Sequence, residues 1–151
     1  MRFTTKTEYG LICLIYIARQ KPGHMVSVKE IVERERFSST YIEKILQKLR
    51  AAHIVIAHHG KQGGYELARA ASQITLKEII EALEGGATFD MNLVAGGFCG
   101  PEVREKIVCT HFSMCGLKPV WQKTKDLLDH FYHSMTLDMI SGEPVKELMA
   151  G

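Results

Sequence analysis

Hydrophobic and polar positions alternate with a helical period over much of this chain. Residues 7–19 are dense enough in apolar side chains to predict a largely buried helix: Tyr9, Ile12, Leu14, Ile15 and Ile17. Cys13 lies inside this stretch, where a small core residue is the expected role. Pro22 and Gly23 then end the helix.

Two shorter helices are predicted next. Ser27 and Glu30 have the spacing of a capping box, which opens a helix that runs to about Arg36. A second helix follows Phe37, because Ser38, Ser39 or Thr40 can cap it and four apolar residues then recur at helical spacing: Ile42, Ile45, Leu46 and Leu49. Two short helices with a tight connection are typical of a helix-turn-helix.

The period then changes to that of strands. Residues 54–59 and 65–68 are expected to form a hairpin around Gly60–Gly64, whose three glycines favour positive φ. A hairpin directly after a helix-turn-helix predicts a winged helix-turn-helix. Thr75 and Glu78 form a further capping box, and the helix that it opens is expected to end at Gly85-Gly86.

The last part of the chain is expected to be a long helix. It starts at Pro119, runs to about residue 141, and carries one apolar stripe, flanked by Trp121 and Tyr132: Val120, Thr124, Leu127, Leu128, Phe131 and Met135. Such a helix either packs against a partner, which we expect, or folds back on its own core. The predicted organisation is therefore mainly α with a small β-hairpin: a winged helix-turn-helix domain (1–84), a cysteine-bearing loop (85–118), a dimerisation helix (119–141) and a flexible tail (142–151).

Composition and charge narrow the range of possible functions. With 46% hydrophobic residues the chain can bury an ordinary core, and no stretch approaches the ~20 apolar residues of a membrane span. MRFTTKTEYG lacks the apolar centre of a secretory signal, so a cytoplasmic protein is expected. Residues 1–69 hold 12 Lys and Arg against 6 Asp and Glu, whereas residues 70–151 hold 7 against 11, so only the first part suits a polyanion.

The second helix of a helix-turn-helix enters the major groove with its first residues nearest the bases. Ser and Thr hydroxyls bond bases or phosphates, Glu43 can accept from cytosine, and the cations reach phosphates. A narrow glycine hairpin with His58 and its neighbours can lie along the adjoining backbone or minor groove. The alternative is that Tyr41 packs inward and Glu43 pairs with Lys44 or Gln47. The predicted DNA-binding residues are Ser38, Ser39, Thr40, Tyr41, Glu43, Lys44, Gln47, Lys48, Arg50, His59, Lys61, Gln62 and Gly63.

Four segments carry a family resemblance. MRFTTKTEYGL, SSTYIEKILQKLRAAHIV, GKQGGYELAR and ITLKEIIEALEG resemble the winged-helix repressors of the IscR and NsrR type, over nearly the whole chain from Met1 to about His133. The usual wing of that family has Arg where this chain has His59, and an imidazole is mostly neutral at pH 7. The resemblance implies a homodimer that binds a pseudo-palindromic operator, with the long C-terminal helices crossing at the dimer interface.

Three of the four cysteines lie close together, as Cys99-x9-Cys109-x5-Cys115. Thiolates on one loop suit an iron–sulfur cluster or zinc. In the resembling proteins three loop cysteines hold a 2Fe–2S or 4Fe–4S cluster; the x5 gap matches theirs and the x9 gap is longer. The rival interpretations are a zinc site with His111 as a fourth ligand, a thiol redox switch, and thiols without a chemical role.

A fourth cluster ligand is expected from elsewhere. The 2Fe–2S regulators that this chain resembles have a His three positions after the third cysteine, and that position is Lys118 here. Some relatives supply an acidic residue from the first helix of the other subunit, at the place that matches Glu8, so Glu8 is the first choice and His111 the second. An oxygen ligand would leave one iron easily displaced by nitric oxide, oxygen or iron scarcity, as a sensor requires.

These observations predict a DNA-binding repressor whose operator affinity depends on an iron–sulfur cluster that senses nitric oxide, redox state or iron supply. The alternative is a cluster-free winged-helix regulator controlled by a small ligand, thiol oxidation or a protein partner. No Ser-His-Asp order, phosphate loop or paired carboxylates stand out, so an enzyme is not expected. The sequence leaves open the cluster type, the fourth ligand, the signal, the operator and the sign of the cluster effect.

Overall fold

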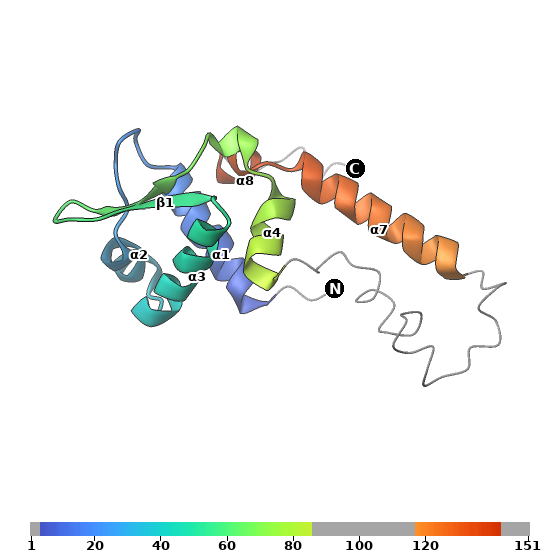
Figure 1. Ribbon diagram of the computed structural model, residues 1–151, viewed down its shortest axis with the longest axis horizontal. Coiled ribbons are helices and arrows are strands. Elements are labelled where there is room, and N and C mark those ends of the chain that lie inside the picture. The colour runs from blue at the N-terminus through green and yellow to red at the C-terminus, as the bar shows by residue number, and fades with distance from the viewer. Residues whose placement is uncertain (1–3, 86–116, 143–151) are drawn as a thin grey trace.

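Helix α1 (Thr5–Ala18) lies at the centre of the fold in the computed structural model of the protein (Figure 1). The structure describes residues 4–85 and 117–142. α1 contacts α3, α4, α8 and the second strand of the hairpin, and its inner face holds Cys13, Leu14 and Ile17 in the main core. The predicted buried helix is confirmed, and Cys13 is fully buried as expected.

Helices α2 (Val28–Glu35) and α3 (Ser39–Ala51) form the helix-turn-helix, with Arg36 in the left-handed region (φ 57°) at the turn. The capping box predicted for α2 is half formed. The Ser27 hydroxyl accepts from the Glu30 amide at 3.1 Å, but the Glu30 carboxylate accepts from the Tyr16 hydroxyl at 2.6 Å. A residue from α1 has therefore replaced the local partner of that carboxylate.

Strands β1 (Val55–His58) and β2 (Gly64–Leu67) pair antiparallel, with Ala57 opposite Tyr65. Val26 adds a single bridge to the other edge of β2, through two backbone hydrogen bonds with Tyr65 of 2.9 and 2.8 Å. The loop turns at Gly60, whose φ of +115° confirms the predicted positive φ. This hairpin is the wing, and it projects from the body beside α2 (Figure 1).

After a short 3-10 turn, η1 (Ala71–Gln73), comes helix α4 (Leu76–Glu84). Its capping box is complete, because the Thr75 hydroxyl accepts from the Glu78 amide at 3.2 Å and the Glu78 carboxylate accepts from the Thr75 amide at 2.8 Å. Gly85 ends the helix in the left-handed region, as predicted. α4 packs against α1, α3 and α7.

The long helix predicted over 119–141 is divided in two. α7 (Leu117–Ser134) begins two residues before Pro119, which its first turn tolerates, and α8 (Leu137–Ser141) follows after a break. At the break the Met135 carbonyl accepts from the Leu76 amide at 2.8 Å, and the Leu137 amide donates to the Ile74 carbonyl at 2.8 Å. Met135 and Leu137 are both buried there, so the helix ends where these two side chains enter the core.

α7 has two different faces. Leu128 and Tyr132 pack on Ile80 of α4, and the Lys77 ammonium lies 2.5 Å from the Asp129 carboxylate. On another side, Val120, Leu127 and Phe131 are 52%, 58% and 45% exposed. Part of the apolar surface thus folds back on the chain's own core, while packing of the exposed part against a partner stays a prediction.

Candidate DNA-binding interface

The first turn of α3 presents small polar side chains to solvent. Ser38 is the N-cap residue, with φ −67° and ψ 128°, and its carbonyl accepts from the Tyr41 and Ile42 amides at 3.1 Å. Its hydroxyl makes no capping hydrogen bond. Ser38, Ser39 and Thr40 are all exposed. Their hydroxyls lie at the positive end of the helix dipole, where a phosphate or a base edge is favoured.

The body of α3 separates cleanly into two faces. Its inner face is fully buried: Ile42, Ile45, Leu46 and Leu49. Its outer face is exposed and holds most of the predicted contacts: Glu43, Lys44, Gln47, Lys48 and Arg50. No ion pair joins Glu43 to Lys44 within the described part of the chain. The helix is therefore anchored by one face and offers the other to a ligand.

Tyr41 differs from its neighbours because its ring packs inward. The ring is half-buried against the core and lies edge-on to Tyr9, with 5.5 Å between ring centroids. Tyr9 in turn stacks on Phe37 at 3.9 Å. The Tyr41 ring therefore packs inward, which was the alternative to a DNA contact. This packing fixes the start of α3 against α1.

Lys48 is also engaged within the molecule. Its ammonium donates to the Leu83 carbonyl in the last turn of α4, at 2.9 Å. The other two cations of the helix, Lys44 and Arg50, are exposed and make no hydrogen bond or ion pair to the described residues. Lys48 is thus the predicted phosphate contact that the structure supports least.

The tip of the wing carries the remaining predicted residues. His59, Lys61 and Gln62 are exposed. Gly63 is required by a close approach, since a Cβ atom there would overlap the His58 carbonyl oxygen. The His58 imidazole itself lies 2.6 Å from the Glu66 carboxylate on the opposite strand. His58, which we expected along the DNA backbone, is therefore engaged across the hairpin.

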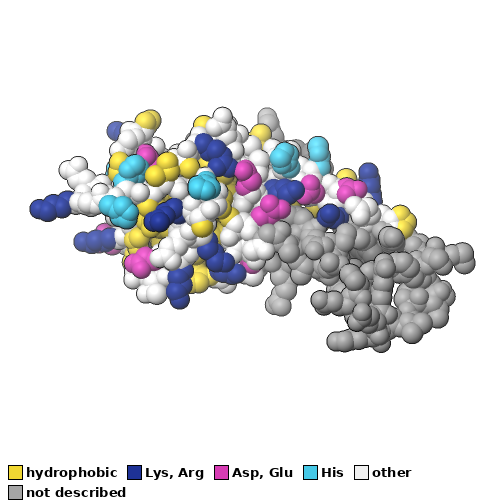
Figure 2. Space-filling model, in the orientation of Figure 1, with side chains coloured by type: hydrophobic (Ala, Val, Ile, Leu, Met, Phe, Trp, Pro, Cys, Tyr) yellow, Lys and Arg dark blue, Asp and Glu magenta, His cyan; other side chains and the backbone are white. Residues whose placement is uncertain are grey.

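Charge is unevenly spread over the face drawn in Figure 2. Lys and Arg side chains, with His between them, are scattered over the body and the wing at the left, with few Asp and Glu; where α7 leaves the body, Asp and Glu gather with Lys and Arg among them. This matches the excess of cations in residues 1–69. A surface of this kind attracts a polyanion to the helix-turn-helix side of the molecule.

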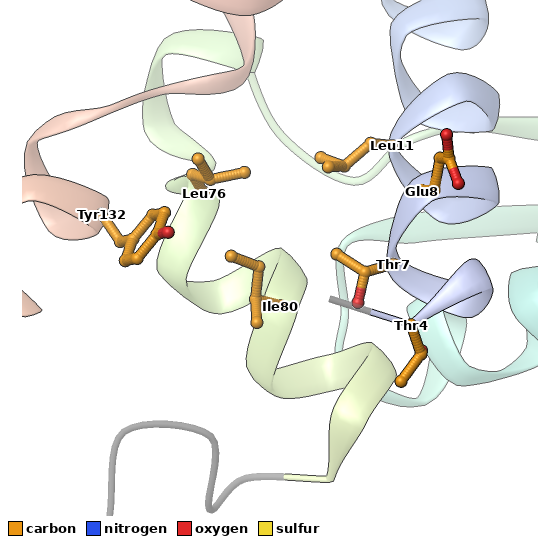
Figure 3. Close-up of a pocket in the computed structure, with 7 residues that line it drawn as sticks. All are labelled: Thr4, Thr7, Glu8, Leu11, Leu76, Ile80 and Tyr132. Atoms are coloured by element: carbon orange, nitrogen blue, oxygen red, sulfur yellow. The ribbon is translucent and has the colours of Figure 1, made fainter. Parts of the chain in front are cut away.

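Glu8, the predicted fourth cluster ligand, lies on α1 beside a pocket of about 420 Å³. The lining comes from the start of α1, from α4 and from α7: Thr4, Thr7, Glu8, Leu11, Leu76, Ile80 and Tyr132 (Figure 3). Leu11 points across the space toward Leu76 and Ile80. Glu8 is exposed, and within the described ranges no hydrogen bond or ion pair engages its carboxylate.

A second carboxylate at the start of α1 is firmly held. Glu84, the last residue of α4, accepts hydrogen bonds from the Thr4 and Thr7 hydroxyls and lies 3.6 Å from the Lys6 ammonium. Burial raises the pKa of Glu84, but these donors outweigh burial and hold the pKa below its ordinary value. The charged form of Glu84 therefore joins α4 to α1.

The predicted cluster cysteines Cys99, Cys109 and Cys115, together with His111, lie outside the described residues. Cys13 is the buried exception, and burial raises the pKa of its thiol to about 12, so it stays protonated and unreactive. Among residues 4–85 and 117–142, no three His, Cys, Asp or Glu side chains gather as a metal site, and no helix is long and apolar enough to cross a membrane.

Comparison with known proteins decides the family. A family model named Rrf2, described as an iron-dependent transcriptional regulator, matches residues 3–143. The chain belongs to the Rrf2 family. Rrf2 proteins are DNA-binding transcriptional regulators and not enzymes. The family therefore confirms two expectations from the sequence: that the chain is a DNA-binding regulator, and that it is not an enzyme.

Relatives within the family include IscR proteins. The regulator IscR of Cereibacter sphaeroides is 42% identical over 86 residues, which is 56% of this chain and 56% of that protein, so the match spans only about half of the relative. The solved IscR of T. potens is 29% identical, with a TM-score of 0.67 and coverage of 100% of this chain and 97% of the other. The predicted resemblance to IscR-type regulators is thus confirmed.

A solved structure of CymR, the global cysteine regulator of B. subtilis, is also similar. It is 26% identical, with a TM-score of 0.70, and the match covers 93% of this chain and 96% of CymR. The predicted fold, mainly helical with a two-stranded wing, is confirmed by these neighbours.

The internal contacts of Lys48 and Glu84 were not predicted from the sequence. The internal role of Lys48 carries no sequence signal, because its partner is a backbone carbonyl far along the chain. Glu84 did offer a signal, since a carboxylate in the last turn of a helix opposes the helix dipole and needs partners elsewhere.

Proposed function

We propose that this Rrf2 regulator is a dimeric repressor that acts in the cytoplasm by inserting α3 into the major groove of an operator. The observation that carries the proposal is the division of α3 into a fully buried apolar face and an exposed polar one. The exposed hydroxyls of the first turn bind bases or phosphates, Glu43 accepts from cytosine N4, and Lys44 and Arg50 bind phosphates.

The wing completes the interface in this proposal. His59, Lys61 and Gln62 are exposed at its tip, where they reach the neighbouring backbone or the minor groove. Lys61, also exposed there, supplies the ammonium cation of the wing tip.

Salt dependence of DNA binding tests this interface. The duplex is one that the protein itself selects from a random pool, and the variants are Lys44→Met and Lys61→Met. Each lost phosphate contact lowers the slope of log K against log salt by about 0.9. Lys125→Met is the matched control, since Lys125 is a cation on α7 about 160° around the helix from Leu127. Variants that keep the wild-type slope would show that α3 and the wing do not hold the DNA.

We further propose that Cys99, Cys109 and Cys115 hold a 2Fe–2S or 4Fe–4S cluster, with Glu8 of the partner subunit as the fourth ligand. The donor set fits: three thiols of the kind that iron–sulfur clusters use, and a carboxylate that is exposed and unengaged within the described residues. When bound, the cluster supplies a centre that nitric oxide, oxygen or iron scarcity alters. Glu8 would supply an oxygen ligand, and an oxygen donor among sulfurs would make that position easier to displace.

Anaerobic purification tests the cluster. Brown protein with visible absorption bands and acid-labile sulfide is expected, and the bands should change in Glu8→Ala but not in His111→Ala. Cluster-loaded and apo protein should differ in affinity for one duplex at one salt concentration. Colourless, iron-free protein that binds DNA normally after reconstitution would contradict the proposal.

The second candidate is a cluster-free regulator controlled by a small ligand, and the pocket of about 420 Å³ beside Glu8 favours it. Its volume is in the range that small-molecule sites occupy. Regulation by a ligand there would survive replacement of all three loop cysteines by serine, whereas regulation by a cluster would not.

A further inference from the structure

The last turn of α4 is packed tightly on the start of α1. Leu83 is fully buried, and Gly10 of α1 lies so close that a Cβ atom there would overlap a Leu83 methyl group. Glu84 receives the hydroxyls of Thr4 and Thr7, and Thr7 is itself buried. The contact is close and its polar atoms are paired, so this turn of α4 is held tightly against the start of α1.

The same turn is joined to the recognition helix. The Lys48 ammonium donates to the Leu83 carbonyl at 2.9 Å. That carbonyl belongs to the last four of α4, which lack partners within the helix, and a cation is favoured at this end of the dipole. One turn of α4 therefore binds α1 through Glu84 and α3 through Lys48.

We propose that Lys48 is a positioning residue: its bond to Leu83 sets the orientation of α3 on DNA, and the last turn of α4 relays changes at the start of α1 to that helix. The inference rests on the proposed function of α3 as the DNA-reading helix. Glu8 lies one turn along α1 from Thr4, and the cysteine-bearing part of the sequence follows Gly85 directly. Glu8 is thus next in sequence to Thr7, which bonds this turn, and the cysteine-bearing segment follows the turn itself in the chain.

A positioning role and a phosphate contact differ in what they do to binding. A phosphate contact adds affinity for every duplex and steepens the salt dependence, whereas correct orientation of α3 adds affinity only for the selected sequence. Lys48→Met removes the donor and keeps the side-chain stem. Lys48→Arg keeps a donor and is the rescue variant, and Lys44→Met is the matched control on the outer face of the same helix.

Binding is measured to a duplex selected by the wild-type protein and to a random-sequence duplex of equal length, over a range of salt. Lys48→Met is expected to bind the selected duplex about tenfold more weakly, the loss of roughly one base contact. Its affinity for the random duplex and its salt slope should not change, and Lys48→Arg should recover most of the loss. A lower slope with equal losses on both duplexes, or no change at all, overturns the proposal.

The control separates this proposal from the one on which it rests. If Lys44→Met leaves affinity and slope unchanged, α3 is not the DNA-reading helix and the proposed function has failed. If Lys44→Met lowers the slope while Lys48→Met fails to alter sequence preference, only the positioning role is wrong.

A double-mutant cycle tests the relay from α1. Glu84→Gln weakens the hold on the start of α1 without touching DNA, and its effect on the selected-to-random affinity ratio should not multiply with that of Lys48→Met, because both act through one turn of α4. Ratios that multiply refute the relay. If circular dichroism shows that Glu84→Gln is unfolded, Thr4→Val, which removes one hydroxyl and keeps the side-chain shape, takes its place.

Discussion

The exposed row on α7 gives a quantitative prediction for the dimer. Val120, Leu127 and Phe131 recur at intervals of seven and four residues, the spacing of a seam between two helices. Each is about half exposed. Full burial of such a side chain is worth about 1.5–3 kcal/mol, so covering the exposed half gives about 1 kcal/mol for each. Three side chains from each protomer then supply about 6 kcal/mol.

Leu127→Asp is the sharpest perturbation, because Leu127 is the most exposed of the three. It removes about 2 kcal/mol from a symmetric dimer and adds the cost of burying two carboxylates. The dissociation constant should rise by at least about 30-fold, since 1.4 kcal/mol corresponds to a factor of ten. Sedimentation equilibrium over a range of protein concentration measures it.

Gln122→Asp is the matched control, with the same new charge about 140° around the helix from Leu127. It should leave the dissociation constant within a factor of about two to three, as is usual for a surface change. Circular dichroism checks that both variants keep their helices. If Leu127→Asp dimerises as tightly as the wild type, the exposed row of α7 is not the interface.

Four further predictions concern single residues. Gly63→Ala should lower the free energy of unfolding in urea by about 1–3 kcal/mol, because the new methyl group overlaps a backbone carbonyl, and should reduce the salt slope of DNA binding as the wing tip moves. Cys13 should resist iodoacetamide at about pH 8 in native protein whose other cysteines are serine, and react in urea, because its pKa is about 12 and it is buried. Thr75→Ala should cost about 1 kcal/mol of unfolding free energy through loss of a complete capping box. Because the folded-state pKa of Glu84 is lowered, its stabilisation is complete above the unfolded value of about 4.3 and is lost as pH falls through the folded value, so Glu84→Gln should flatten the acid side of a plot of urea midpoint against pH.

Helices and strands were predictable where neighbouring residues in the sequence determine them. The two capping boxes show where such prediction from local sequence stops. Ser27 with Glu30 and Thr75 with Glu78 have the same spacing, yet only the second is complete. Glu30 accepts from Tyr16 and lies 3.1 Å from the His24 imidazole, and both of these groups come from outside the helix that it opens. A motif predicts where a helix begins, but tertiary partners decide which of its hydrogen bonds form.

The break between α7 and α8 was not predictable in the same way. No glycine or proline lies between Phe131 and Leu137, and the apolar stripe continues through Met135. The helix ends because the backbone at Met135 and Leu137 pairs with residues 74–76, in a part of the chain about 60 residues earlier. Burial of the Met135 and Leu137 side chains there stabilises the fold more than continuing the helix would.

In the candidate DNA-binding interface, too, local pattern predicts some residues and tertiary partners determine others. The exposed polar face of α3 follows from its helical period, so most of the residues predicted to contact DNA are exposed, while their contacts with DNA stay predictions. Tyr41 and Lys48 are the exceptions, and both have partners from α1 or α4 that the period of α3 does not reveal. For the same reason the charge of a cation on a recognition helix does not by itself assign it to DNA.

The end of α4 shows how a helix terminus can join three elements at once. A carboxylate in the last turn opposes the helix dipole, so Glu84 is unfavourable for α4 alone, and its paired hydroxyls and ammonium on α1 are what make the charge tolerable. The Lys48 ammonium favours the same end, so α1 and α3 both hold it by charged groups. Since Gly10 allows α1 to approach Leu83 with no side chain between them, the contact has little room to yield. In the proposed relay, this tight contact is what would pass a shift of α1 on to α3 instead of letting the core absorb it.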